Sequence, residues 1–215
     1  MNGVVKIKRD EKVSYYTHFF GFLLAIIGTI LLIYVSNKNY EIINSVVYGL
    51  SVIFLFLSSS LYHAYKKKEG EISFWRKLDH FAIFIMIAGT YTPICYFYLT
   101  GYWKWLIISV QWFLVLGGFF FKFFYLKAPR YLYTIIYLIM GWSGIIPIKQ
   151  FINTMPFNSI IYLFSGGLSF TIGAVFYMLK KPKIKYFGFH EIFHVFILIG
   201  AFVHYLLVYN AIVAN

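Results

Sequence analysis

Three histidines at the ends of two apolar runs have the residue type and spacing of a zinc site. His63 ends one run, and His190 and His194 begin another. Imidazole is a common zinc ligand, and residues four apart lie on the same face of a helix. If the two runs are helices whose ends meet, the three side chains can share one zinc ion.

The runs that must position these histidines are long enough to cross a membrane. The chain has 215 residues, of which 61% are hydrophobic and 12% charged, and its mean hydropathy is +0.74. Soluble proteins are about 25% charged, and about 20 apolar residues span a bilayer. The length therefore allows seven or eight spans with short connections. Long, continuously apolar runs favour helices over the alternating strands of a barrel.

Charged borders mark seven apolar runs, and they predict an all-α membrane protein, a seven-transmembrane helix bundle. The fourth run is short, and we expect it to extend to residue 124 with Lys122 snorkelling to the surface. A loop is expected at 153–156, before the sixth helix. We divide the chain into a short N-terminal segment, 1–12, and a transmembrane domain, 13–215. The runs are 15–35, 42–65, 80–103, 105–121, 131–148, 158–179 and 186 to about 211.

The distribution of positive charge predicts the orientation. Of the 19 Lys and Arg residues, all but Lys38, Lys104 and Lys149 lie in connections on one side of the seven runs. Positive residues favour the cytoplasmic side, so the N-terminus should be cytoplasmic and the C-terminus external. Six or eight spans would break this alternation. Short basic clusters between apolar runs suit anionic lipid headgroups, so we expect membrane lipids as partners and no nucleic acid.

This topology brings Ser59 and Asp79 to the same membrane face as the three histidines. Three protein ligands and one open position are typical of catalytic rather than structural zinc. Asp79 could hold a zinc-bound water or act as its base, and Ser59 could orient a ligand or a substrate carbonyl. Two alternatives stay open. Asp79 could instead pair with Arg76 or Lys77, and Ser59 could serve close helix packing.

The remaining polar residues of the spans have simpler interpretations. We interpret His18 and His80 as interfacial polar residues. His204 lies roughly 15 Å beyond His194 along the last run, too far to share a metal with it, and is expected to be a hydrogen-bonded packing residue. Cys95, the only cysteine, excludes an intramolecular disulfide and is expected to pack in the core.

The segment 190–194 also matches the His-Glu-x-x-His pattern of zinc proteases. That interpretation fails, because no Asp or Glu follows Glu191 to act as a third ligand. The positions at which a metzincin has Gly and His are occupied by Ile197 and Gly200. The third ligand must then come from upstream, and His63 is the best candidate. Glu191 could be a base, pair with the basic sixth connection, or face the interior of the bundle.

Taken together, these motifs resemble the hemolysin III family. That family is the bacterial branch of the progestin and adipoQ receptor family, which includes the adiponectin receptors. The likeness extends from residue 11 to about residue 205, which is nearly the whole chain. It is carried by the segments 11–18, 59–63, 79–80 and 190–194.

The resemblance implies a seven-helix bundle with a cytoplasmic N-terminus, in a bacterial plasma membrane. It also implies zinc held by His63, His190 and His194, with Asp79 and Ser59 near the zinc-bound water. The wider superfamily includes alkaline ceramidases, which hydrolyse lipid amides, and bacterial members are linked to haemolysis and to membrane lipid homeostasis. The long cytoplasmic N-terminal region of the receptors is not present, which disfavours hormone signalling.

Two function classes follow. The leading hypothesis is a zinc-dependent hydrolase of lipid amides or esters, in which Asp79 accepts a proton from water, Ser59 positions the substrate and the bundle holds its acyl chain. The alternative is a non-enzymatic cytolytic or receptor-like membrane protein with structural zinc. A transporter or channel is disfavoured, because few polar residues occur in the external halves of the spans.

Overall fold

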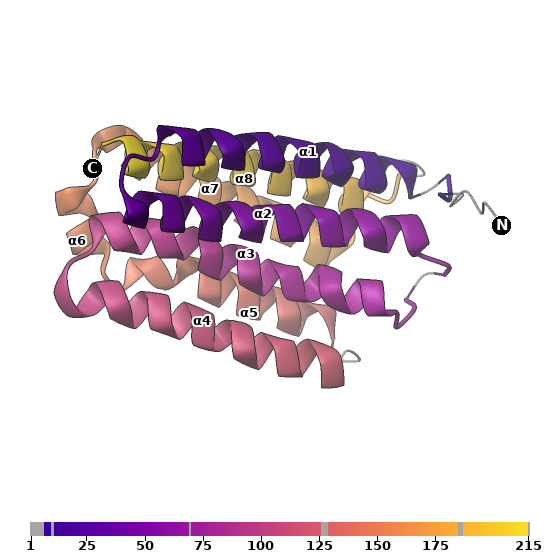
Figure 1. Cartoon of the computed structure of the whole chain (residues 1–215). Coiled ribbons are helices and arrows are strands. Elements are labelled where there is room, and N and C mark those ends of the chain that lie inside the picture. The colour runs from indigo at the N-terminus through magenta and orange to yellow at the C-terminus, as the bar shows by residue number, and fades with distance from the viewer. Residues whose placement is uncertain (1–6, 10, 69, 126–128, 185–186, 215) are drawn as a thin grey trace.

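The described part of the chain is a bundle of helices (Figure 1). A computed structural model describes residues 7–9, 11–68, 70–125, 129–184 and 187–214. No β-strand occurs among these residues. The helices are α1 (Lys12–Val35), α2 (Asn39–Tyr65), α3 (Phe74–Tyr98), α4 (Gly101–Phe124), α5 (Arg130–Trp142), the 3-10 helix η1 (Ser143–Ile145), α6 (Ile148–Thr154), α7 (Phe157–Leu179) and α8 (Phe189–Val213).

The helix lengths agree with seven membrane crossings. Six helices are each long and apolar enough to span a bilayer, and the count is seven if α5, η1 and α6, which are bent by 55°, make one broken span. A helix satisfies its backbone hydrogen bonds internally, as hydrocarbon surroundings require. Helix α1 begins at one end of the bundle and α8 finishes at the other (Figure 1). The predicted seven-helix membrane bundle is confirmed.

Two features of the topology stay predictions. The cytoplasmic N-terminus and the external C-terminus stay predictions, which rest on the distribution of positive charge. The division into 1–12 and 13–215 also stays a prediction, since residues 1–6 and 10 lie outside the described residues. Lys6, Lys127 and Lys185, which contribute to the charge count, and Tyr186, the predicted start of the seventh run, likewise lie outside them.

The boundary between the third and fourth spans was predicted wrongly. Helix α3 ends at Tyr98, and α4 starts at Gly101, which has a positive φ of 56°. The run predicted to end at residue 103 therefore includes a tight, uncharged turn, which hydropathy does not reveal. Helix α3 also begins at Phe74, capped by the hydroxyl of Ser73, so that Asp79 lies inside the helix.

The fifth span is broken rather than continuous. Helix α5 ends at Trp142, and the chain passes through η1 and Pro147 before α6 begins. Proline cannot donate a backbone hydrogen bond and disfavours the preceding helical turn. The expected loop at 153–156 is partly wrong, because α6 continues to Thr154, but α7 begins at Phe157, next to the predicted start at 158.

Lys122 does not snorkel to the surface as predicted. Helix α4 does extend to Phe124, but the Lys122 side chain is fully buried. Its ammonium group lies over the ring of Tyr133 and 3.4 Å from Nδ1 of His80. The aromatic ring and the imidazole give the buried cation partners inside the bundle.

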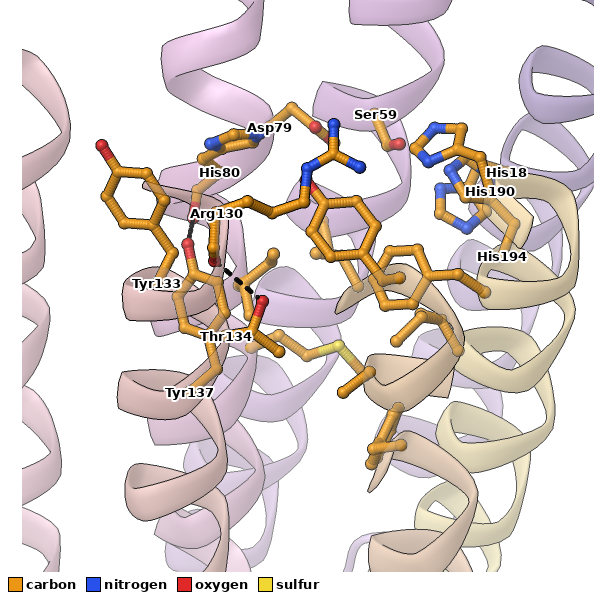
Figure 2. A pocket seen from close by; sticks show the side chains of 18 of the residues that line it. His18, Ser59, Asp79, His80, Arg130, Tyr133, Thr134, Tyr137, His190 and His194 are labelled. Carbon is orange, nitrogen blue, oxygen red and sulfur yellow. Dashed lines mark hydrogen bonds between the residues drawn. The ribbon is translucent and has the colours of Figure 1, made fainter. Parts of the chain in front are cut away.

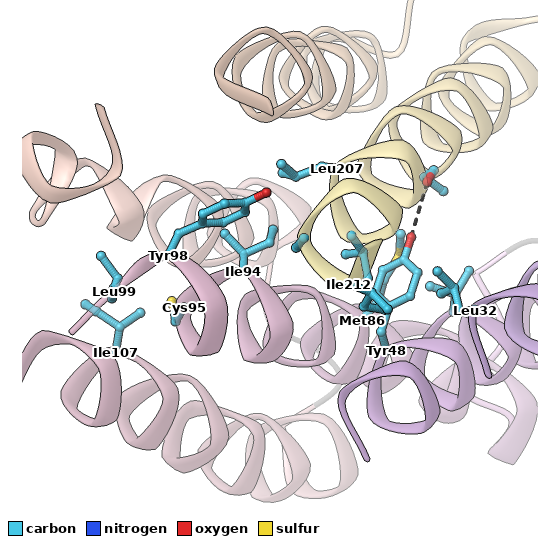
Figure 3. Close-up of a cluster of buried hydrophobic side chains, with 14 of the residues drawn as sticks. Leu32, Tyr48, Met86, Ile94, Cys95, Tyr98, Leu99, Ile107, Leu207 and Ile212 are labelled. Carbon is cyan, nitrogen blue, oxygen red and sulfur yellow. Dashed lines mark hydrogen bonds between the residues drawn. The ribbon is translucent and has the colours of Figure 1, made fainter. Parts of the chain in front are cut away.

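The larger hydrophobic cluster packs between α1, α2, α3 and α8, with contributions from α4 and α6 (Figure 3). Leu32, Tyr48, Leu207 and Ile212 pack there, from the end of α1, the start of α2 and the end of α8. Cys95 belongs to the same cluster and is fully buried, which confirms its predicted packing role.

Close helix packing depends on glycines at several contacts, of which two are the tightest. A Cβ added to Gly89 of α3 would lie 2.0 Å from Oγ of Ser51 in α2, and one added to Gly166 of α7 would lie 2.2 Å from Cδ2 of His204 in α8. Such distances are possible only for glycine, as is common where membrane helices approach closely. These contacts set the spacing between α2 and α3 and between α7 and α8.

Candidate metal centre

Three histidine side chains meet where α2 ends and α8 begins. His63 is in the last turn of α2, and His190 and His194 are in the first two turns of α8. One ring nitrogen from each lies within 4.8 Å of the others, and Nε2 of His190 is 3.3 Å from Nε2 of His63. His63 and His194 are almost fully buried. The predicted convergence of these three residues is confirmed, and the metal they would bind is a separate question.

Glu11 holds the ring of His63 from the opposite side. The carboxylate of Glu11 accepts a hydrogen bond from Nδ1 of His63 at 2.6 Å and one from Nζ of Lys66 at 2.5 Å. Burial alone would raise the pKa of the Glu11 carboxyl, but the hydrogen bonds and charges of His63 and Lys66 hold it below its usual value. The ionised carboxylate fixes the proton on Nδ1 and leaves Nε2 of His63 free to bind a metal.

His18 stacks directly on one of the three histidines. Its ring centroid lies 3.6 Å from that of His194, with 14° between the ring planes. The residue is buried, so its interpretation as an interfacial residue is wrong. Neither ring nitrogen of His18 has a hydrogen-bond partner among the described residues. The stacking restricts the orientation of the His194 ring.

Asp79 and Ser59 line a cavity of about 600 Å³, and Ser59 lies beside His18 and His190 (Figure 2). Both residues line this cavity together with His190 and His194. The cavity thus brings the two residues predicted to act on water and substrate to the side of the histidine cluster that is open.

The alternative in which Asp79 pairs with a neighbouring cation is not supported. Arg76 donates hydrogen bonds to the backbone carbonyls of Gly70 and Glu71, at 3.0 and 2.9 Å. Lys77 donates to a backbone carbonyl of α4 at 3.1 Å. Within the described residues, neither cation forms an ion pair with Asp79.

Glu191 has a structural place at the start of α8. One carboxylate oxygen accepts a hydrogen bond from the backbone N–H of Gly188 at 2.8 Å, and the other accepts one from the hydroxyl of Ser14 at 2.9 Å. The first contact caps the helix N-terminus and the second ties it to α1. Both oxygens are therefore engaged, which disfavours Glu191 as a general base.

His204 lies apart from the cluster, as expected. Nε2 of His204 is 3.3 Å from the backbone carbonyl of Leu163, so the residue is hydrogen-bonded between α7 and α8. His80 lies on the far wall of the cavity, where the hydroxyl of Tyr137 donates to its backbone carbonyl at 2.8 Å (Figure 2). Neither histidine belongs to the group of three.

Sequence reasoning missed a cation in the cavity, Arg130 at the start of α5. Its guanidinium carbon lies 4.4 Å from the ring centroid of Tyr177, and one terminal nitrogen is buried without a hydrogen-bond partner among the described residues. The side chain points into the cavity between α3 and α7 (Figure 2). Its place after Pro129, at a predicted span border, made it look like an ordinary interfacial charge.

Comparison with known proteins agrees with these motifs and this fold. Residues 7–205 match the model of the family described as haemolysin-III related. The chain is 34% identical to a hemolysin-3 homolog of Bacillus subtilis (strain 168), over 90% of each chain. It is 32% identical to hemolysin-3 of Bacillus cereus, over 94% of this chain and 91% of the relative.

A more distant relative connects the chain with receptors. It is 26% identical to the adiponectin receptor protein of Drosophila melanogaster, over 91% of this chain and 49% of the relative. The bacterial relatives and the apolar helices together support the plasma membrane as the location of a multi-pass protein. The chain belongs to the haemolysin-III related family.

Proposed function

We propose that this protein is a zinc-dependent hydrolase of lipid amides or esters. The observation that carries the proposal is the meeting of three histidine nitrogens, because two of the three residues, His190 and His194, line a cavity that Asp79 and Ser59 also line. The part of the cavity that lies away from the histidines has apolar walls suited to an acyl chain. A metal site that opens onto such a cavity combines a Lewis acid with a place for a lipid carbonyl.

The distance between two of the three histidine nitrogens supports zinc. Two nitrogens bound to a tetrahedral zinc at about 2.0–2.1 Å lie about 3.3–3.4 Å apart. Nε2 of His63 and Nε2 of His190 are 3.3 Å apart. In addition, Nδ1 of His194 is buried without a hydrogen-bond partner among the described residues. The Glu11–His63 contact is the carboxylate–histidine arrangement that commonly supports a zinc ligand.

In the proposed hydrolysis, Asp79 transfers the proton and Ser59 positions the substrate. A zinc ion at this site would polarise the substrate carbonyl and make water more acidic. Asp79 takes a proton from the attacking water, whose oxygen bonds to the carbonyl carbon. The carbon–nitrogen or carbon–oxygen bond then breaks, and Asp79 returns the proton to the leaving amine or alcohol. Ser59 lines the same cavity and positions the substrate carbonyl.

Arg130 gives the cavity a fixed positive charge near the reacting groups. Its buried nitrogen is a donor without a partner among the described residues, and an unpaired buried donor is costly. A headgroup or carboxylate oxygen of a bound lipid would satisfy it. This supports a lipid with an oxygen-rich head next to its carbonyl, rather than a plain hydrocarbon.

The experiment compares His63→Ala, Asp79→Asn and the parent protein, each purified and measured for zinc content and for fatty-acid release from a ceramide and from a phospholipid. We expect His63→Ala to lose zinc and activity, and Asp79→Asn to keep zinc and lose activity. His204→Ala serves as a control for zinc content only, because it removes an imidazole that lines the cavity but does not belong to the cluster. Unchanged zinc in His63→Ala would contradict the site.

The same variants test the alternative role. If Asp79→Asn keeps zinc and the parent protein releases no fatty acid from either lipid, the zinc is structural and the protein acts without catalysis. Two relatives carry the name hemolysin-3, so lysis of erythrocytes by cells expressing Asp79→Asn is the matching measurement. Lysis equal to that of the parent favours the non-enzymatic role.

A further inference from the structure

The cavity is a channel whose length can be counted along its helices. Its lining residues on α3 run from Asp79 to Tyr91, and those on α5 run from Arg130 to Trp142. At about 1.5 Å per residue, each of these stretches is about 18 Å long. The hydrocarbon core of a bilayer is about 30 Å thick, so the channel reaches about as deep as one lipid leaflet.

The lining positions follow the helical repeat, so they form continuous stripes that face the channel. On α5 the stripe recurs every three or four residues and finishes at Gly141 and Trp142, and on α7 it finishes at Gly167. Both glycines therefore lie in the deepest turn of their stripe. A Cβ added to Gly141 would meet no atom within 4 Å, and one at Gly167 would make only ordinary contacts with Trp142, at 3.7 Å or more.

Bulky side chains close the deep end, and hydrogen bonds fix each of them. The hydroxyl of Tyr91 donates to the backbone carbonyl of Gly141 at 2.6 Å, and Nε1 of Trp142 donates to Thr171 at 3.0 Å. Nε2 of His204 is 3.3 Å from a backbone carbonyl of α7. Rings held in this way form a rigid floor, because moving one of them would break a hydrogen bond in apolar surroundings.

We infer that this deep end measures the acyl chain. Gly141 and Gly167 leave room for the last methylene groups of an unbranched chain of one-leaflet length, and Tyr91, Trp142 and His204 stop it. The inference rests on the proposed function, since it assumes that the carbonyl end lies near the histidines. It adds a chain-length preference, set by two glycines far from the metal ligands.

Fatty-acid binding tests this chain-length preference, and the test does not require the protein to hydrolyse a lipid. The purified full-length protein is titrated with octanoate, laurate, palmitate and stearate, each competing with a fluorescent fatty acid. We expect palmitate to bind best to the parent protein. Gly141→Leu should weaken palmitate about tenfold, because its side chain replaces at least one or two buried methylenes, while laurate keeps its affinity. Trp142→Ala should shift the preference towards stearate.

Gly117→Leu is the matched control. Gly117 also lies in a helix and is exposed, a Cβ there would likewise meet no atom within 4 Å, and it does not line the channel. We expect its chain-length preference to equal that of the parent. The proposed chain-length preference is refuted if folded Gly141→Leu prefers the same chain length as the parent protein, or if the parent protein binds none of the acids. If the variants shift the preferred fatty-acid length but the protein hydrolyses no lipid, the chain-length proposal is supported. Only the proposed hydrolase function is then refuted.

Discussion

The carboxylate of Glu11, immediately before α1, lies 2.6 Å from Nδ1 of His63 in the last turn of α2. This contact joins the start of the first helix to a residue of the histidine cluster. It fixes which nitrogen of His63 carries the proton, and thereby which nitrogen can bind a metal. Lys66 balances the charge of the carboxylate from the other side, at 2.5 Å. The residue immediately before the first helix is thus part of the candidate metal centre.

Replacing Glu11 should weaken metal binding without removing a ligand. In Glu11→Gln the amide cannot carry the negative charge that makes the His63 ring a better donor. We expect zinc affinity to fall by about 10–100-fold, the usual effect of losing such a partner. Competition with a chromogenic chelator measures it. Glu71→Gln is the control, since Glu71 accepts backbone hydrogen bonds from Lys67 and Lys68 outside the cluster. Equal affinities for the two variants would contradict the role of Glu11.

Glu191 should matter for stability and not for proton transfer. In Glu191→Gln the amide oxygen can still accept the hydrogen bond from Gly188, so we expect zinc content and activity to match the parent protein. Glu191→Ala removes the cap and should destabilise the protein by about 0.5–2 kcal/mol. Thermal unfolding and fatty-acid release measure the two effects. Loss of activity in Glu191→Gln with zinc retained would make Glu191 the base.

His18 should support His194 through its ring and not through its nitrogens. His18→Phe keeps a flat ring over His194, so zinc should remain bound in the same amount. His18→Ala removes the stacking partner and leaves a void, which we expect to cost about 2–4 kcal/mol of stability. Zinc analysis together with thermal unfolding separates these outcomes. If His18→Phe loses its zinc, His18 is itself a ligand.

Much of the fold could be predicted from the sequence because bilayer thickness sets the length of each apolar run. The tight turn before Gly101 could not, since no charged residue interrupts the hydropathy there. The break after Trp142 was hidden in the same way, although Pro147 marks its far side. Burial of Lys122 depends on rings supplied by another helix, such as Tyr133, and hydropathy carries no information about such partners.

The site shows the same division between local and distant information. The spacing of His190 and His194 is a local pattern, and the charge count placed His63 at the same membrane face. By contrast, Glu11 meets His63 from 52 positions away, and no spacing rule connects them. The stacking of His18 on His194 likewise depends on how α1 packs against α8.

Helix packing around the site depends on Gly89, and this can be tested by one methyl group. In Gly89→Ala the new Cβ would lie 2.0 Å from Oγ of Ser51, so α2 and α3 must separate or Ser51 must change its rotamer. Overpacking of this kind costs about 1–3 kcal/mol. Gly117→Ala adds the same methyl group in open space and should be neutral, or stabilising by up to about 1 kcal/mol. Ser51→Gly combined with Gly89→Ala should recover the lost stability, because the Ser51→Gly substitution removes the side chain that clashes with the new Cβ. Thermal unfolding in detergent measures all three, and a Gly89→Ala protein as stable as Gly117→Ala would show that the two helices do not approach so closely.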